Sequence, residues 1–102
     1  MKSQQQLLVS SKSLPGREEE YVSWYLNEHI ADVLAVPGFN SGQFFRSLDA
    51  SGKDLGEFKA LYQVDAEEPS VLIGALMGRI GEMHVSAAID PASVTFTFLV
   101  PA

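Results

Sequence analysis

The sequence predicts an α+β domain in which two helices cover one face of a four-stranded antiparallel sheet. Strand-like and helix-like patterns of apolar residues follow one another in the order strand, helix, strand, strand, helix, strand. The chain has 102 residues, of which 46% are hydrophobic, and this suits one small globular domain over 1–102. These observations favour one sheet with a single core.

Chain-breaking residues separate the first strand from the first helix. The strand is expected over 5–11, where apolar residues precede a turn. Three glutamates at 18–20 then favour a helix start, because negative side chains interact well with the N-terminal end of a helix dipole. We expect the helix to end at 35–36, because Pro37 disfavours helical geometry in the residue before it and Gly38 lets the chain reverse.

Two rows of side chains follow helical spacing along this first helix. One row is apolar and predicts a buried stripe formed by Val22, Leu26, Ile30, Val33 and Leu34. The other row lies at the margin of that stripe and consists of Tyr21, Tyr25, His29 and Asp32. Because the segment also holds the only tryptophan of the chain, Trp24, it is both a core element and the best candidate for a site.

Alternation, turn residues and helical spacing predict the rest of the chain. The second helix contains three glycines, so packing on the sheet must stabilise it. The expected elements are strands at 39–48 and 57–65 with a hairpin turn at 49–56 between them, a helix from Pro69 to Gly81, an irregular connection at 81–92 and a last strand at 93–101.

This order of elements folds most simply into a ferredoxin-like βαββαβ sandwich with both helices on one sheet face. Right-handed crossovers place the first and third strands in the middle of the sheet. The strands carry Phe or Leu on both faces, so the face without helices would be a large apolar patch. We therefore expect a homodimer, in which two sheets pack face to face as a dimeric α/β barrel.

Two segments add a family resemblance to this pattern. WYLNEHIADVLAVPGF at 24–39 joins a helical Trp and His to a Pro-Gly-Phe turn, and FKALYQVDAEEPS at 58–70 leads from a strand into the second helix. Together with a last strand that ends in Pro, these segments resemble the dimeric α/β-barrel superfamily, specifically its EthD-like branch. The resemblance covers nearly the whole chain.

Resemblance to this branch implies cofactor-free enzymes that act on aromatic, polyketide or lactone substrates, in a superfamily that also includes muconolactone isomerases and haem-binding members. It also implies a ligand cavity between the sheet and the helices. Carried onto this chain, His29 projects from the first helix toward the cavity. By its spacing alone, Asp32 lies three residues after His29 and can orient it or stabilise its charge. The implied substrate-binding residues are Trp24, Tyr25, Tyr62 and Phe39.

The residues themselves leave two interpretations of His29 open. Histidine exchanges protons near neutral pH, so His29 can act as an acid or base in isomerisation, cyclisation or lactone cleavage of a small aromatic or carbonyl-bearing molecule. It can equally be a hydrogen-bonded core histidine, in which case the chain is a non-catalytic small-ligand-binding or accessory protein. We expect His84 to be a solvated or interface residue.

Composition argues against several other classes of protein. The net charge is −6 and the seven Lys and Arg residues are scattered, so a nucleic-acid partner is not expected. Without cysteine, and with no metal-ligand spacing among the histidines and carboxylates, neither a metal nor another cofactor is expected. No apolar run is long enough for a signal peptide or a membrane span, so we expect a cytoplasmic protein.

Overall fold

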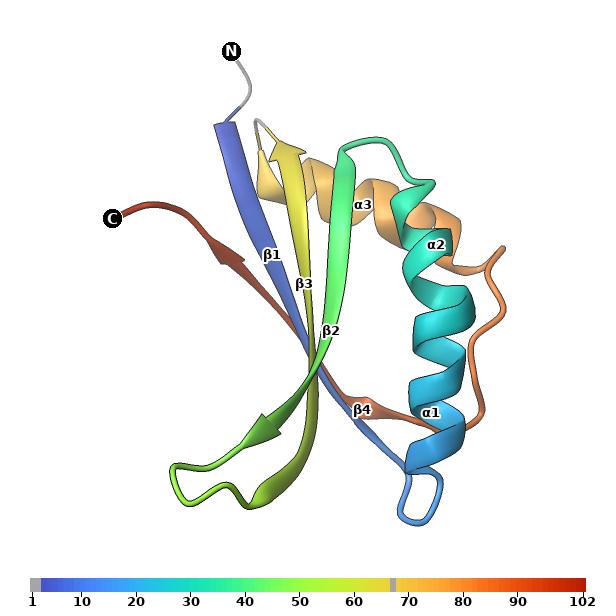
Figure 1. Ribbon diagram of the computed structural model, residues 1–102. Coiled ribbons are helices and arrows are strands. Elements are labelled where there is room, and N and C mark those ends of the chain that lie inside the picture. Colours follow the sequence, from blue (N-terminus) through green and yellow to red (C-terminus); the bar gives the residue numbers. More distant parts are fainter. Residues whose placement is uncertain (1–2, 67) are drawn as a thin grey trace.

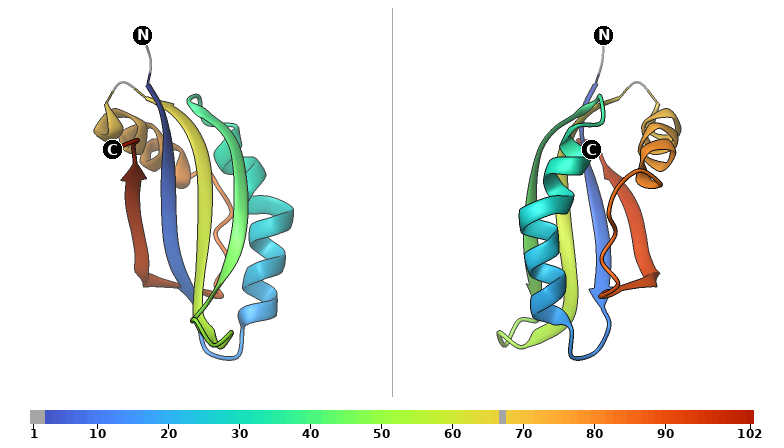
Figure 2. Two further views of the ribbon diagram at one scale, coloured as in Figure 1. Left: turned by 60° about the vertical axis from the view of Figure 1, so that its left-hand side comes forward. Right: turned by 90° about the vertical axis from the view of Figure 1, so that its right-hand side faces the viewer.

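The computed structural model describes residues 3–66 and 68–102 and shows a four-stranded antiparallel sheet with its helices on one face (Figure 1). The strands are β1 (Ser3–Ser13), β2 (Phe39–Leu48), β3 (Asp54–Ala66) and β4 (Ile89–Leu99). Their order across the sheet is β2-β3-β1-β4, so the first and third strands are central, as predicted. The helical segments are α1 (Glu18–Trp24), η1 (Tyr25–His29), α2 (Ile30–Leu34) and α3 (Pro69–Ile80). The first helix and α3 lie on the same side of the sheet in two further views (Figure 2). The predicted ferredoxin-like α+β fold is therefore confirmed.

The first helix runs without a break from Glu18 to Leu34 and contains a π-turn in its middle. The backbone N–H of Ile30 donates to the Tyr25 carbonyl five residues earlier, which is the hydrogen-bond pattern of a π-helix. This wider turn changes which side chains face the sheet: Tyr21, Trp24 and Tyr25 are buried, while Leu26 is 56% exposed. The expected buried stripe is therefore wrong at Leu26, because its spacing assumed an uninterrupted α-helix.

The helix ends at Leu34, shortly before the expected Pro-Gly stop. Gly38 has a φ of 100°, a conformation that side chains with a Cβ rarely adopt. Its carbonyl accepts a hydrogen bond from the Asp65 backbone N–H at 2.9 Å, and a Cβ on Gly38 would lie only 2.7 Å from Leu72 Cδ1. The turn thus brings the end of the first helix, β3 and α3 into close contact.

Strand β2 has the predicted bounds but contains a bulge at its start. The pairing of β2 with β3 shifts register between Phe39 and Ser41. Because one extra residue reverses the alternation, Phe39 is buried on the helix side, where its ring meets Tyr62 edge to face at 5.7 Å between centroids. Simple alternation along 39–48 would place Phe39 on the same face as Ser41, and the bulge prevents this.

Strand β4 begins at Ile89, within the segment expected to be an irregular connection. The residues around Pro91 pair with β1, where Ile89 lies opposite Ser13. A proline is tolerated here because β4 is an edge strand and needs no hydrogen bond on its outer side. The pairing of β1 with β4 shifts register between Ser10 and Lys12, and here the Ser93 hydroxyl accepts the backbone N–H of Lys12 at 2.8 Å.

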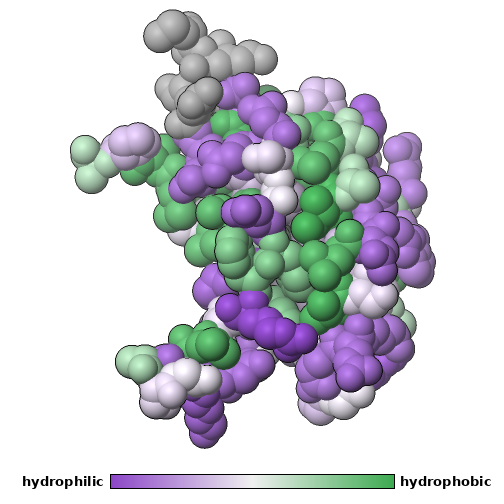
Figure 3. Space-filling model, viewed as in Figure 1, coloured by the Kyte–Doolittle hydropathy of each residue, from purple (hydrophilic) through white to green (hydrophobic). Residues whose placement is uncertain are grey.

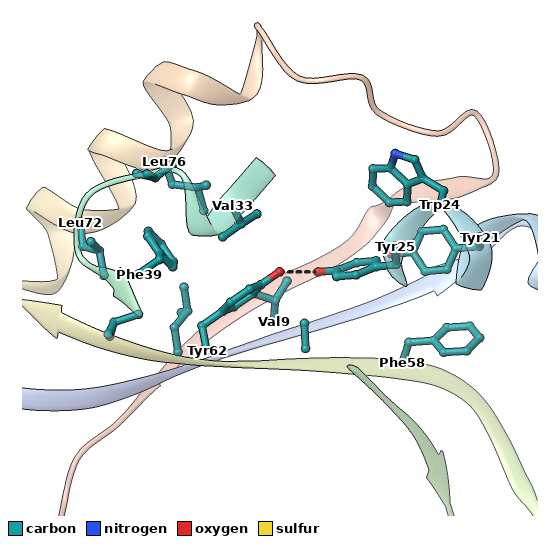
Figure 4. Packing of buried hydrophobic residues seen from close by; sticks show 14 of the residues in the cluster. Val9, Tyr21, Trp24, Tyr25, Val33, Phe39, Phe58, Tyr62, Leu72 and Leu76 are labelled. Atoms are coloured by element: carbon teal, nitrogen blue, oxygen red, sulfur yellow. Dashed lines mark hydrogen bonds between the residues drawn. The ribbon is translucent and has the colours of Figure 1, made fainter. Parts of the chain in front are cut away.

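Aromatic rings between the first helix and the sheet form much of the core (Figure 4). The rings of Tyr25, Phe44 and Phe58 stack in series, with centroid distances of 4.1 Å and 5.3 Å. Helix α3 adds Leu72 and Leu76, which are buried beside Phe39 and Val33 in Figure 4, whereas Met77 near its other end is 41% exposed. Among the described helices, none is long and apolar enough to cross a bilayer.

The sheet face that carries no helix has a mixed surface. Leu8 and Leu61 face one another on it and are half-buried, while Phe45 is exposed. The β2–β3 hairpin and the C-terminal segment both extend to this side, away from the helices (Figure 1), and apolar atoms are visible on the hairpin (Figure 3). Leu48 of β2 and Leu55 of β3 are exposed.

Candidate functional site

A cavity of about 470 Å³ lies between the helix side of the sheet, the first helix and α3. Its wall is mostly apolar. It is formed by the first helix, β1, α3, β4 and the loop between α3 and β4, and it includes Val9, Val33, Leu76, Ile80 and Val94. Met77, Val85 and Phe96 also line it and are partly exposed, so the cavity opens to solvent between α3 and β4. Its volume and apolar lining are typical of small-molecule sites.

The π-turn explains why three aromatic side chains of one helix reach this cavity. Trp24 and His29 are five residues apart, which in an α-helix would separate them by about 140° around the axis. Their rings instead stack, with centroids 4.4 Å apart and planes 24° apart. Tyr25 meets His29 edge to face at 4.8 Å. All three side chains line the cavity.

His29 is half-buried and presents its imidazole to this cavity. Within the described part of the chain, its Nδ1 is buried without a hydrogen-bond partner. Burial lowers the pKa of His29 below its ordinary value, and the negative charges of Asp32 and Glu28 oppose this shift without cancelling it. The ring is therefore uncharged near neutral pH.

Tyr25 and Tyr62 bring two hydroxyl groups together at the cavity wall. The Tyr62 hydroxyl donates to the Tyr25 hydroxyl oxygen at 3.4 Å, a long hydrogen bond drawn in Figure 4. Burial raises the pKa of Tyr62 to about 12. Burial also raises the pKa of Tyr25, and the neighbouring Tyr62 raises it further. Both side chains therefore keep their protons at physiological pH.

A second hydroxyl pair lies on another part of the wall. Ser11 of β1 and Tyr21 of α1 share a hydrogen bond of 2.6 Å between their side-chain oxygens, and both residues are buried. Burial raises the pKa of Tyr21, although the Ser11 hydroxyl works in the opposite direction. The cavity thus contains two hydroxyl pairs and one imidazole in an otherwise apolar wall.

Charged side chains near His29 lie outside the cavity. Asp32 lines a shallow depression that it shares with Glu28, Arg79 and His84. His84 is exposed, as expected, and its Nδ1 lies 2.9 Å from a Glu28 carboxylate oxygen. Its backbone carbonyl accepts the Trp24 indole N–H at 3.0 Å, which ties the loop after α3 to the first helix. Among the described residues, no three His, Asp or Glu side chains gather as metal ligands.

The structure brings together four of the six residues expected at the site. Trp24, Tyr25, His29 and Tyr62 line the cavity. Phe39 does not, because the β2 bulge places it in the core. Asp32 lies three residues after His29 but beyond the π-turn, and it lines the outer depression.

Sequence reasoning missed the residues that other elements contribute. Ser11 alternates in phase with Leu7 and Val9, so its inward position could have been read from the strand pattern. No comparable signal marks Met77 or Val85, because they reach the cavity through the tilt of α3 and the course of a loop.

The strand order, the helices on one sheet face and the cavity define a ferredoxin-like α+β domain with a small-molecule-sized hollow under its first helix. Solved structures that share this fold include two that cover nearly the whole chain. A protein from Shewanella loihica PV-4, provisionally named a monooxygenase, superposes with a TM-score of 0.62 at 14% sequence identity, covering 100% of this chain and 97% of its own. An ethyl tert-butyl ether D (EthD) family protein from Bacillus halodurans C-125 superposes with a TM-score of 0.60 at 10% identity, covering 96% and 99%.

At 14% and 10% sequence identity, these two likenesses confirm the predicted fold. No family model matches the sequence, and no curated protein matches it.

Proposed function

We propose that this chain binds a small aromatic or carbonyl-bearing molecule in the cavity and catalyses proton-transfer chemistry on it, namely isomerisation, cyclisation or lactone cleavage, without a cofactor. One observation carries the proposal: the imidazole of His29 reaches the cavity while its Nδ1 has no partner among the described residues. A structural histidine in a packed core would normally satisfy both of its nitrogens.

The groups around the cavity suit the stabilisation of a developing negative charge. Tyrosine hydroxyls that keep their protons donate hydrogen bonds to an oxygen on which charge accumulates, and an apolar wall strengthens such bonds. Asp32 acts on His29 through its negative charge, which raises the imidazole pKa against the larger effect of burial. The two solved structures that share the fold, one provisionally named a monooxygenase and one an EthD family protein, are compatible with small-molecule chemistry on this scaffold.

The test begins with a thermal-shift screen of aromatic and lactone compounds, followed by turnover of any compound that binds. Trp24 is the only tryptophan of the chain and lines the cavity, so its fluorescence reports occupancy directly. We expect His29→Ala to lower turnover about 10²- to 10⁴-fold, the usual contribution of a general acid or base. The matched control is His84→Ala, which changes the exposed histidine and should retain full activity. Unchanged turnover in His29→Ala would show that the catalytic assignment is wrong.

A non-catalytic binding protein is the second candidate. It is favoured by the position of Asp32, which lines the outer depression and leaves the imidazole without a carboxylate partner inside the cavity. In this case a compound would quench Trp24 fluorescence and stabilise the fold, yet be recovered chemically unchanged after long incubation with the protein.

We also propose that the sheet face without helices packs against a second copy of the chain. Leu8, Leu61 and exposed Phe45 lie on this face, and exposed leucines extend toward the same side on the β2–β3 hairpin. Analytical ultracentrifugation at micromolar concentration should show a dimer, and Phe45→Glu should shift it toward monomer because the glutamate charge would be buried. A stable wild-type monomer at that concentration would remove this proposal.

A further inference from the structure

The chemical role of His29 depends on which of its two nitrogens carries the proton. Within the described residues, Nδ1 is buried and has no hydrogen-bond partner. A proton on Nδ1 would place an N–H donor in the interior with no acceptor, and buried N–H groups without partners are rarer than buried acceptors without partners. The neutral ring is therefore more stable with its proton on Nε2. The imidazolium ion carries protons on both nitrogens, so charging the ring meets the same obstacle.

Two aromatic rings hold the imidazole of His29 in place. Trp24 covers one face of the imidazole with a centroid distance of 4.4 Å, and the Tyr25 ring meets it edge to face at 4.8 Å. His29 nevertheless lines the cavity. With Nδ1 enclosed, Nε2 is the nitrogen left to a ligand.

Tyr25 supplies a second donor from the same helical turn. Its hydroxyl oxygen accepts a hydrogen bond from Tyr62, so its own proton is left free for another partner (Figure 4). Donation from Tyr62 also polarises the Tyr25 hydroxyl and makes it a stronger donor. Tyr25 and His29 are in ring contact and both line the cavity, so the two donors lie on one part of its wall.

The cavity offers no charge to balance an ionic ligand. None of the described residues that line it is Asp, Glu, Lys or Arg. The charged groups that surround His29 line the outer depression instead: Glu28 and Asp32 on its own helix, Arg79 on α3, and Glu82 and His84 in the loop that follows. A carboxylate or phosphate would lose its hydration in the cavity without gaining a cation.

We infer that His29 works as a neutral imidazole whose Nε2–H donates, together with the Tyr25 hydroxyl, to one oxygen of the ligand, and that the site therefore selects an uncharged molecule bearing a ketone or lactone carbonyl. This inference rests on the proposed function and narrows it: His29 polarises a carbonyl group and does not act as a base. The two hydrogen bonds strengthen as negative charge develops on that oxygen.

The first test needs no ligand. The chain has two histidines, so ¹⁵N-histidine labelling with His84→Gln as the assignment control resolves the His29 ring by NMR. We expect the nitrogen shifts of His29 to report a neutral Nε2–H ring near pH 7, with a titration midpoint below the ordinary value of histidine. A ring protonated on Nδ1, or an imidazolium near pH 7, would overturn the inference and leave cavity binding untouched.

The second test compares three molecules that share one ring system: 2-acetylnaphthalene, 2-ethylnaphthalene and 2-naphthoate. Isothermal titration calorimetry should show the ketone binding about tenfold more tightly than the hydrocarbon, as expected for hydrogen bonds of ordinary strength, and the anion binding more weakly than both. Tyr25→Phe should remove most of the advantage of the ketone. Ser11→Ala, which alters the other hydroxyl pair of the cavity, tests whether the ketone binds at that pair instead.

Each alternative result has a separate meaning. Naphthoate binding as tightly as the ketone overturns the selection of uncharged ligands. Loss of the ketone's advantage in Ser11→Ala but not in Tyr25→Phe places the carbonyl at the wrong hydroxyl pair and overturns the donor assignment. Failure of all three compounds to bind counts against the proposed function, whereas the nitrogen shifts judge the state of His29 independently.

Discussion

Replacing Gly42 with alanine tests whether Tyr62 is held as rigidly as the candidate site requires. Gly42 lies opposite Tyr62 in the β2–β3 pairing. A Cβ at this position would lie 2.8 Å from both Cδ1 and Cε1 of the Tyr62 ring and 3.4 Å from Ile30 Cγ2. Because Tyr62 is only 1% exposed, the ring cannot swing into solvent to relieve this contact.

The magnitude follows from two opposing effects. Forcing an extra methyl group into a packed core costs about 1–3 kcal/mol. Replacing glycine by alanine at an unstrained position recovers about 0.4–1 kcal/mol by restricting the unfolded chain, and Gly42 does not have a positive φ. The net loss in the free energy of unfolding is about 0.5–2.5 kcal/mol, or a Tm lowered by on the order of 10 °C in a domain of this size.

Helix α3 offers a matched control for this substitution. Gly74 lies inside the helix, and a Cβ there would meet nothing within 4 Å. Gly74→Ala should therefore raise the free energy of unfolding by about 0.5–1 kcal/mol. Urea unfolding followed by circular dichroism gives the free energy of unfolding of both variants. An m-value equal to that of wild type shows that the same two-state transition is measured. If Gly42→Ala is as stable as Gly74→Ala, the Tyr62 ring has room to move and the cavity wall is not fixed as described.

Three further substitutions probe the turn, the second hydroxyl pair and the imidazole. Gly38→Ala should lower stability by about 1–2 kcal/mol or more, since the left-handed conformation alone costs that much; a urea midpoint equal to wild type would contradict this. Ser11→Ala leaves the Tyr21 hydroxyl buried without its partner and should cost about 1–3 kcal/mol, whereas adding Tyr21→Phe should recover much of the loss; a double-mutant cycle without coupling would show that the pair is unimportant. The pKa of folded His29 lies below its unfolded value of 6.5, so as the pH falls the unfolded chain binds a proton first and stability decreases through this range. Urea midpoints at about pH 7.5 and 5.5 should therefore differ less in His29→Gln than in wild type, and an unchanged difference would contradict the lowered pKa of His29.

The elements themselves were largely predictable because their signals are local. Strand β2 has the predicted bounds, and α3 begins at the predicted Pro69 and ends one residue before Gly81. The central positions of β1 and β3 followed from crossover handedness, which depends on the order of elements and not on individual side chains.

Predictions that depended on register were less successful. The π-turn exposes Leu26 and stacks His29 on Trp24, and the bulge in β2 turns Phe39 inward. The π-turn and the bulge each insert a single residue. The insertion costs little free energy locally but changes the direction of the side chains around it. Nothing in the spacing of apolar residues distinguishes an inserted residue from a regular one.

The sequence alone therefore determined the kind and order of the elements, the sheet order and the helix that carries the candidate site, because propensity, turn chemistry and handedness act over a few residues. Only the tertiary structure decided that Tyr25, His29 and Tyr62 share a cavity while Asp32 lines an outer depression. That choice depends on a π-turn, a bulge and the tilt of α3, whose energies are set by packing between segments far apart in the chain.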